Sequence, residues 1–343
     1  MKALVLENYM DLRYQDVPLP VTNEKEVLVR VKAVGICGSD VHGMDGSTGR
    51  RIPPIIMGHE ASGQIEKTGE KVNGWKEGDR VTFDSTIYDP GDWYTKKGMY
   101  NLSDGRMVLG VSTEEFKKNG AFAEFVSVPE HILHKIPEGV SYTEAALVEP
   151  AAVAMHAINI SGLKPDDLVV VLGAGMVGMF VIQLLRIKGC KNIIAIDLED
   201  HRLGLAMKLG AHQVFQPTDP QLMATIKSLS NNRGADLAIE VVGISETVAL
   251  SIELLRKGAT LTLVGNLSPT IQLPLQKVVT RQLRIQGSCA INGEYPAVLE
   301  LIAQKKLDVT SILSAEAPLS EGASWFKRLY EREENLMKVI LRP

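Results

Sequence analysis

The chain has 343 residues, of which 45% are hydrophobic and 23% charged, and a formal net charge of −4. This length predicts two domains, and the hydrophobic share is large enough for each domain to bury a core. The nearly balanced charge disfavours nucleic acid as a main partner, and three widely spaced cysteines imply no disulfide framework.

The chain opens with MKALVLENYMDLRYQDVPLP, which is predicted to form a strand and a turn. This segment lacks the basic and apolar regions of a signal peptide. The longest apolar run, LVVVLGAGMVGMFVIQLL, contains a glycine-rich turn, which favours a strand–turn–helix over a membrane span. We therefore expect a cytoplasmic protein without a membrane partner.

Residues 1–150 are rich in short strand patterns bounded by Gly, Pro or charged turns. Examples are EVLVRVKAVG, ASGQIEKTG, GDRVTF and AEFVSVP. Such spacing is typical of antiparallel β structure. We predict a barrel-like antiparallel domain in this part of the chain.

Candidate metal ligands lie in three separated segments of this first domain: GICGSDVHG, MGHE and ALVEP. The polar side chains of these segments are Cys37, Ser39, Asp40, His42, His59, Glu60 and Glu149. Cysteine, histidine and carboxylate together are the ligands of a catalytic zinc, which needs three protein ligands and one open position. Their wide spacing indicates a site assembled by the fold rather than by a zinc finger.

Between residues 151 and 287 apolar strand patterns alternate with helical ones. The predicted strands are LVVVL, NIIAID, HQVF, DLAIEVVG and TLTLVG, and HRLGLAMKLG is a predicted helix. Strands that alternate with helices indicate βαβ units and a parallel sheet. We predict an α/β domain for these residues.

A glycine-rich turn of the form G-x-G-x-x-G joins the first of these strands to a helix. Its residues are Gly173, Gly175, Met176, Val177 and Gly178. The first glycine would permit a tight turn, the second would let a pyrophosphate approach the backbone, and the third would let the helix pack against the strand. Unpaired amides at the helix N-terminus would then face the phosphates.

Asp197 ends the next predicted strand, where an acid can bind the ribose 2′-hydroxyl of a dinucleotide. A carboxylate there would repel a 2′-phosphate, so we predict NAD rather than NADP; the alternative is that Asp197 caps a helix. Arg202 could lie over the adenine or pair with Glu199. Val264 and Gly265, at the end of TLTLVG, are further candidate cofactor contacts.

The last segment, residues 288–343, contains a predicted helix, EYPAVLELIAQKK, and short strand patterns such as LMKVIL. Periodicity does not decide whether these elements extend the parallel sheet or return to the first domain. We expect a partial return to the first domain.

Together these segments resemble the zinc-dependent medium-chain dehydrogenase/reductase superfamily, in its sorbitol (polyol) and threonine dehydrogenase branch. The resemblance rests on GICGSDVH, GHEASGQIEKTGEKV, GDRV, GAFAEFVSVP, EPAAVAMHA, GAGMVG and AIDLEDHR. It implies a GroES-like β-barrel catalytic domain, a Rossmann domain with a doubly wound parallel sheet, and a cleft between them. It also implies a homodimer or a homotetramer.

The same resemblance implies roles for the residues of the first domain. Cys37, His59 and Glu60 match the zinc ligands, and Glu149 matches an acid that either ligates zinc or holds its water. Ser39 and His42 match a relay that carries the proton of the alcohol to solvent. Glu149 precedes a proline in what is predicted to be a helix start, so a simple helix cap is the alternative.

One departure from the family concerns a second, structural zinc that many relatives hold on four cysteines. The corresponding segment here, STIYDPGDWYTKKGMYNLSDG, has Asp89, Asp92, Thr95 and Ser103 at those positions. Without thiolates an all-cysteine site is impossible, so we predict one zinc per chain. The two aspartates are predicted turn residues, and the segment is predicted to be held by packing of Tyr88, Trp93, Tyr94 and Tyr100.

A second departure concerns the substrate, because Ser288, Cys289, Ala290 and Ile291 stand where sorbitol dehydrogenases carry Phe-Arg-Tyr. The predicted activity is therefore hydride transfer between NAD and a secondary alcohol or its ketone, on a polyol, sugar alcohol or sugar derivative. Three alternatives stay open: a threonine or other amino-alcohol dehydrogenase, a zinc-free quinone reductase of the same fold, and a protein without catalytic activity.

Overall fold

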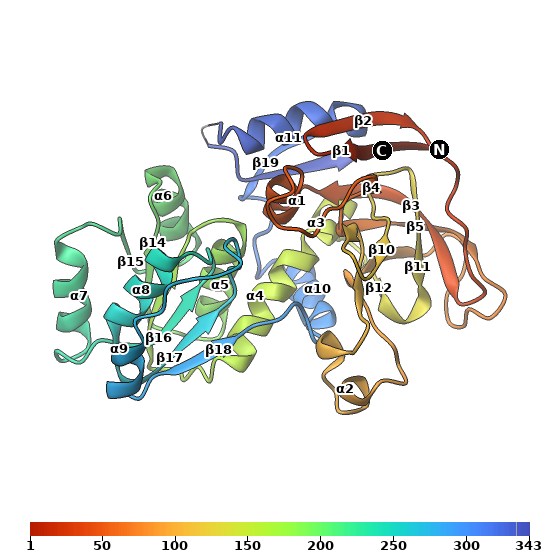
Figure 1. Ribbon diagram of the computed structural model, residues 1–343. Helices are drawn as coiled ribbons and strands as arrows, with labels where there is room; N and C mark the ends of the chain where they lie inside the picture. Colours follow the sequence, from red (N-terminus) through yellow and green to blue (C-terminus); the bar gives the residue numbers. More distant parts are fainter. Residues whose placement is uncertain (334) are drawn as a thin grey trace. The chain divides into compact units, whose positions relative to one another are not determined.

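Figure 1 shows the computed structural model of the chain, which describes residues 1–333 and 335–343. The chain divides into two compact units. The first contains residues 1–149, 291–305 and 309–343, and the second contains residues 150–290 and 306–308. Within the described ranges, no helix combines the length and the apolar character that crossing a bilayer requires.

Seven strands of the first unit form the sheet that carries the candidate metal ligands. The strand order is β12–β6–β5–β3–β20–β19, and β11 also pairs with β3. The strands are β3 (Glu26–Gly35), β5 (Glu60–Thr68), β6 (Arg80–Phe83), β11 (Phe125–Pro129), β12 (Leu133–Lys135), β19 (Leu313–Pro318) and β20 (Lys338–Arg342). The pairs are antiparallel, as predicted for residues 1–150, except that β19 and β20 are parallel.

Shorter elements complete the first unit. Three strands pair in the order β2–β1–β4, and two further pairs are β9 with β10 and β7 with β8. The strands are β1 (Lys2–Asn8), β2 (Asp11–Asp16), β4 (Ile55–Ile56), β7 (Thr86–Ile87), β8 (Met107–Val108), β9 (Val111–Ser112) and β10 (Lys117–Lys118). The helices are α1 (Gly38–Gly43), α2 (Trp93–Lys96), α3 (Tyr142–Ala146), α10 (Tyr295–Ala303) and α11 (Gly322–Tyr330).

The C-terminal segment adds to the sheet of the first unit. β20 pairs antiparallel with β3, with Leu341 opposite Val34 and Ile340 opposite Gly35. These strands bury valine, isoleucine and leucine side chains in the core of that unit. The pairing brings the residue that opens β20, Lys338, into the interior of the unit.

The second unit is built on a six-stranded parallel sheet in the order β15–β14–β13–β16–β17–β18 (Figure 1). Its strands are β13 (Leu168–Leu172), β14 (Asn192–Ile196), β15 (Gln213–Phe215), β16 (Ala235–Glu240), β17 (Leu255–Leu263) and β18 (Arg284–Gly287). Its helices are α4 (Val148–Ile160), which begins at the end of the first unit, α5 (Met176–Ile187), α6 (Asp200–Leu209), α7 (Gln221–Leu229), α8 (Ser245–Leu254) and α9 (Leu275–Thr280). The predicted parallel sheet is confirmed, and the fully buried β13 has the apolar run expected of a central parallel strand.

Candidate metal centre

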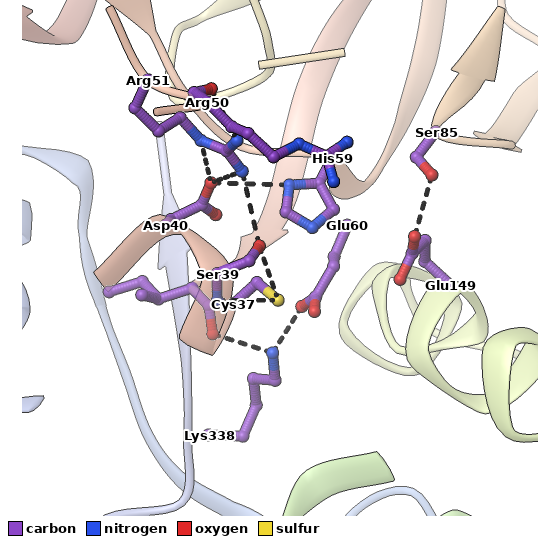
Figure 2. A network of polar contacts seen from close by, with 11 residues as sticks. Cys37, Ser39, Asp40, Arg50, Arg51, His59, Glu60, Ser85, Glu149 and Lys338 are labelled. Carbon is purple, nitrogen blue, oxygen red and sulfur yellow. Dashed lines mark hydrogen bonds and ion pairs between the residues drawn. The ribbon is translucent and has the colours of Figure 1, made fainter. Parts of the chain in front are cut away.

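Three side chains with metal-binding atoms converge in the first unit. The donor atoms of Cys37, His59 and Glu60 all lie within 4.8 Å of one another (Figure 2). His59 and Glu60 are buried, whereas Cys37 is partly exposed. A thiolate, an imidazole and a carboxylate with one accessible side form a donor set that fits a catalytic zinc ion.

The convergence follows from how α1 and β5 begin. Cys37 caps the N-terminus of α1, and its Sγ accepts hydrogen bonds from the amide and the hydroxyl of Ser39, at 3.5 and 3.3 Å. Glu60 opens β5 opposite Gly35, the last residue of β3. A Cβ on Gly35 would lie 2.3 Å from the Glu60 carboxylate, so this glycine leaves the space that the acid occupies.

Glu60 has a buried cationic partner that sequence reasoning missed. Lys338 Nζ donates to Glu60 Oε2 at 2.5 Å and to the carbonyl of Ile36 at 2.8 Å. Burial alone would lower the pKa of Lys338, but the charges of Glu60 and Cys37 raise it above its usual value. The sequence feature that could have indicated this buried partner is the lysine within the otherwise apolar strand LMKVIL.

His59 has a carboxylate on its other side. Asp40 Oδ1 lies 3.5 Å from His59 Nδ1 and accepts hydrogen bonds from Arg51 Nε and Nη2 at 3.1 and 2.8 Å (Figure 2). Burial acts to raise the pKa of Asp40, but the neighbouring His59 and Arg51 hold it well below its usual value. The sequence analysis assigned no role to Asp40 and did not identify Arg51.

Glu149 lies beside this cluster in the first turn of α4. Its Oε1 accepts a hydrogen bond from Ser85 Oγ at 2.8 Å. Burial raises the pKa of Glu149 to about 7; the charge of Glu60 adds to this rise, whereas His59 and Ser85 oppose it. Glu149 is outside the three-residue donor group found among the described residues, and it is the second residue of α4 rather than a flanking cap.

Ser39 and His42 both belong to α1, three residues apart, so they share one face of this short helix. Ser39 Oγ also lies 3.4 Å from Arg51 Nη2. His42 is half-buried, and burial and the nearby Arg332 lower its pKa, while Asp45 acts to raise it. The proton relay through these two residues stays a prediction.

Comparison with known proteins adds to this geometry. The alcohol dehydrogenase GroES-like domain matches residues 23–138, and the zinc-binding dehydrogenase family matches residues 176–304. Sorbitol dehydrogenase of Bacillus subtilis (strain 168) is 30% identical over 100% of this chain and 97% of its own length. The chain belongs to the zinc-dependent medium-chain dehydrogenase/reductase superfamily.

Solved structures of this superfamily match the whole chain. The 2R,3R-butanediol dehydrogenase of Bacillus subtilis is 30% identical with a TM-score of 0.88, over 100% of this chain and 99% of that structure. A zinc-binding dehydrogenase of Sinorhizobium meliloti 1021 bound to NADP is 27% identical with a TM-score of 0.90, over the same shares. The predicted combination of a GroES-like domain and a Rossmann sheet is thereby confirmed.

The glycine-rich turn of this superfamily member has backbone geometry and close contacts that only glycine accommodates. Gly173 has φ +97°, and a Cβ there would lie 2.7 Å from Val242. A Cβ on Gly178 would lie 1.9 Å from the carbonyl oxygen of Gly173, so only glycine lets α5 pack this close. Gly175 caps α5 and has open space at its Cβ position, next to Met176 and Val177 in the first turn.

Asp197 is hydrogen-bonded to this turn. Its Oδ2 accepts from the amide of Ala174 at 2.7 Å, and its Oδ1 accepts from the amide of Glu199 at 3.0 Å. The ion pair of Arg202 is with Asp197 Oδ1, at 3.9 Å, and not with the predicted Glu199. Asp197 therefore lies between the glycine-rich turn and a positive charge.

Val264 and Gly265 follow β17 and lie close to the same region. Both amides donate to the carbonyl of Glu240, at 2.8 and 3.1 Å. A Cβ on Gly265 would lie 2.2 Å from the backbone of Val242, which also crowds Gly173. The predicted cofactor residues of the second unit thus follow the carboxyl ends of β13, β14 and β17, apart from Arg202, which lies in α6.

The segment without cysteines, residues 88–105, is held by aromatic and polar contacts. Tyr88 stacks on Tyr100 with ring centroids 4.4 Å apart, and the Tyr100 hydroxyl donates to the buried Asp84 at 2.7 Å. Asp92 caps α2, and Asp89 accepts from the amide of Gly91, so both serve local turns as predicted.

The predicted packing role of Trp93 is wrong. Its side chain is 61% exposed and meets the edge of the Tyr94 ring, with Lys97 over its face. The aromatic side chains of the segment therefore differ: Tyr88 and Tyr100 stack and are partly buried, whereas Trp93 is exposed and contacts the partly buried Tyr94. Composition alone does not distinguish the two pairs.

Proposed function

We propose that the chain is a zinc-dependent, NAD-linked dehydrogenase of a polyol or another secondary alcohol with a neighbouring hydroxyl. The observation that carries the proposal is the Cys37, His59 and Glu60 donor group in a member of this superfamily. The names of two relatives, sorbitol dehydrogenase and 2R,3R-butanediol dehydrogenase, support a substrate with adjacent hydroxyl groups.

In the proposed reaction a zinc ion would be held by Cys37, His59 and Glu60, with Glu149 as a fourth ligand or as the acid beside it. The metal would act as a Lewis acid that favours the alkoxide form of the alcohol. Ser39 Oγ would accept the hydroxyl proton as it releases its own, and that proton would reach solvent through the ribose hydroxyls of the cofactor and His42, because an imidazole exchanges protons near neutral pH. The carbinol hydride would go to the nicotinamide ring of the cofactor.

The proposed function is tested by metal analysis and a substrate panel. We expect one zinc per chain and NAD-dependent oxidation of polyols, with His59→Ala losing both the zinc and the activity. Oxidation confined to threonine or another amino alcohol would favour that alternative. A protein that holds no zinc and reduces quinones would overturn the proposal in favour of the zinc-free reductase.

The cofactor preference rests on Asp197. Its carboxylate would bind the ribose 2′-hydroxyl of NAD and repel a 2′-phosphate, while the adjacent Arg202 would be available to a phosphate once the acid is removed. We expect wild-type kcat/KM to favour NAD and Asp197→Ser to reduce this preference. Glu199→Ser is the matched control, since it removes a neighbouring acid and should leave the preference unchanged. A wild-type preference for NADP would contradict the assignment.

We also propose that the chain self-associates, as a dimer, along the edge of its parallel sheet. β18 forms one edge, and all four of its residues are exposed. Exposed apolar side chains accompany it, namely Leu273, Leu275, Val279 and Ile285. Light scattering should show a dimer, which Ile285→Lys dissociates and Met207→Lys on α6 does not. A monomeric wild type would overturn the proposal.

A further inference from the structure

We propose that Arg51 is a positioning residue of the zinc site, which fixes the carboxylate of Asp40 and, through it, the orientation of the ligand His59. This inference rests on the proposed zinc site of Cys37, His59 and Glu60. It assigns a role to an arginine that lies outside the donor group and does not itself bind a metal.

The ion pair of Arg51 and Asp40 is one of the most deeply buried in the first unit. The side chains are 4% and 0% exposed. Two nitrogens of the guanidinium donate to the same oxygen, Asp40 Oδ1, and this oxygen also faces His59 Nδ1. Asp40 Oδ2 has no hydrogen-bond partner in the part of the chain that the structure describes. The position of Oδ1 therefore depends on Arg51.

Asp40 Oδ1 lies 3.5 Å from His59 Nδ1, which makes no hydrogen bond within the described residues, so the two groups interact through charge rather than through a hydrogen bond. A negative charge beside Nδ1 favours the proton on that nitrogen and leaves Nε2 as the electron-pair donor. Carboxylates that bind the second nitrogen of a ligating histidine fix its ring orientation and raise its basicity. Arg51 would thus act on the metal through Asp40 and His59.

A second contact joins Arg51 to the other ligand-bearing segment. Arg51 Nη2 lies 3.4 Å from Ser39 Oγ, and this hydroxyl lies 3.3 Å from Cys37 Sγ. One guanidinium therefore touches a neighbour of the thiolate and a neighbour of the imidazole (Figure 2). An ammonium group could replace the charge but not this planar arrangement of donors.

The backbone and a glycine hold the arginine in place. Ser112 pairs with the chain on both sides of Arg51, since its amide donates to Arg50 and its carbonyl accepts from Ile52. A Cβ on Gly43 would lie 2.4 Å from Arg51 Cγ. Gly43 thus provides the space in which the stem of Arg51 crosses α1, and Gly43→Ala would displace the arginine without altering its charge.

The test measures zinc release to a chromophoric chelator and the visible absorption of the cobalt-substituted enzyme, which reports the ligand geometry. We expect Arg51→Met to weaken zinc affinity about 10–100-fold, the loss that follows removal of a partner of a metal ligand, to speed zinc release accordingly, and to shift the cobalt bands. Arg51→Lys and Gly43→Ala should give smaller changes of the same kind. If Arg51→Met does not fold, the Arg51→Lys and Gly43→Ala variants test the role of Arg51.

Arg256→Met is the matched control. It removes an arginine that pairs with Asp236 in the second unit and should alter neither zinc release nor the cobalt spectrum. The role of Arg51 would be overturned if, in all three test variants, the rate of zinc release stays within twofold of wild type and the cobalt bands do not shift. If the His59→Ala variant holds as much zinc as the wild type, the zinc site itself is misassigned, and both proposals fail.

Discussion

Asp40 and Asp84 are both buried in the first unit, yet their pKa values shift in opposite directions. Burial acts to raise both, but at Asp40 the neighbouring His59 and Arg51 reverse this effect and lower the pKa. At Asp84 burial prevails and raises the pKa to about 6, because hydrogen bonds from Thr86 and Tyr100 oppose it only in part. Burial alone therefore does not decide the charge of an interior acid; the charge of its partner does.

The same contrast extends to the second acid of each region. Beside Asp40, Glu60 is paired with the buried cation Lys338. Beside Asp84, Glu149 is paired with the neutral hydroxyl of Ser85, and its pKa is raised to about 7. We call Asp40, Glu60 and their partners the cation-paired region, and Asp84, Glu149 and their partners the hydroxyl-paired region.

The largest expected effect comes from removing the cation that pairs with Glu60. Lys338→Met would leave an uncompensated buried carboxylate, which costs about 3–5 kcal/mol of unfolding free energy. The measurement is denaturant unfolding of the metal-free protein. Lys305→Met, which breaks an exposed pair with Glu144, should cost about 0–1 kcal/mol. An equal loss in the two variants would contradict the contrast.

The hydroxyl-paired region should show its own dependence on pH. Because the folded-state pKa of Asp84 is about 6, above the usual 3.8, the folded protein holds this proton more tightly than the unfolded chain. Asp84 therefore makes stability fall as pH rises from 4 to 6, by about 3 kcal/mol in total. The metal-free Asp84→Asn variant should not lose this stability. The difference in unfolding free energy, variant minus wild type, should therefore increase as pH rises from 4 to 6. A constant difference would refute the assignment.

A smaller effect is expected from the tyrosine that docks residues 88–105. Tyr100→Phe removes the donor to Asp84 and the acceptor of the Gly293 amide, and should cost about 1–3 kcal/mol. The loss should be greater at pH 7 than at pH 4, since only the charged acid needs the donor strongly. Tyr330→Phe, which breaks an exposed contact with Asp45, should change unfolding free energy by less than about 0.5 kcal/mol.

The smallest effect should come from the cap of α2. Asp92 Oδ1 accepts from the amides of Tyr94 and Thr95, and Asp92→Ala should cost about 1 kcal/mol, seen as faster hydrogen exchange in residues 93–97. Zinc content should not change, because this aspartate serves a turn. Asp92→Asn should keep most of the protection. Loss of zinc in either variant would mean that the residue is a ligand.

Much of the fold, and the grouping of several candidate site residues, could be predicted from the sequence because these features depend on local patterns. The glycine-rich turn needs its residues at fixed spacing, and the strands of both sheets have apolar runs that end at turns. Asp89 and Asp92 were identified as turn residues for the same reason. These features depend only on residues close together in the chain, so the sequence alone is enough to predict them.

The partners of the buried acids were not accessible in this way. Lys338 reaches Glu60 across 278 positions, and Arg51 reaches Asp40 only because Gly43 leaves room for the arginine side chain. In the sequence Asp84 is one of several acids that follow a strand, and its hydrogen bond from Tyr100 is seen only in the structure. Which charge meets which carboxylate is decided by the packing of distant elements, which periodicity and motif spacing do not encode.

The position of Lys338 in the chain also bears on how the protein is made. The ribosome synthesises Glu60 278 residues before Lys338. At about 5–20 residues per second, roughly 15–55 s pass before the cation exists. Throughout this interval Glu60 lacks this partner, so its carboxylate stays hydrated or meets another cation. A dissolved divalent ion is one such cation, and the proposed zinc site would then receive its metal before the polypeptide is complete.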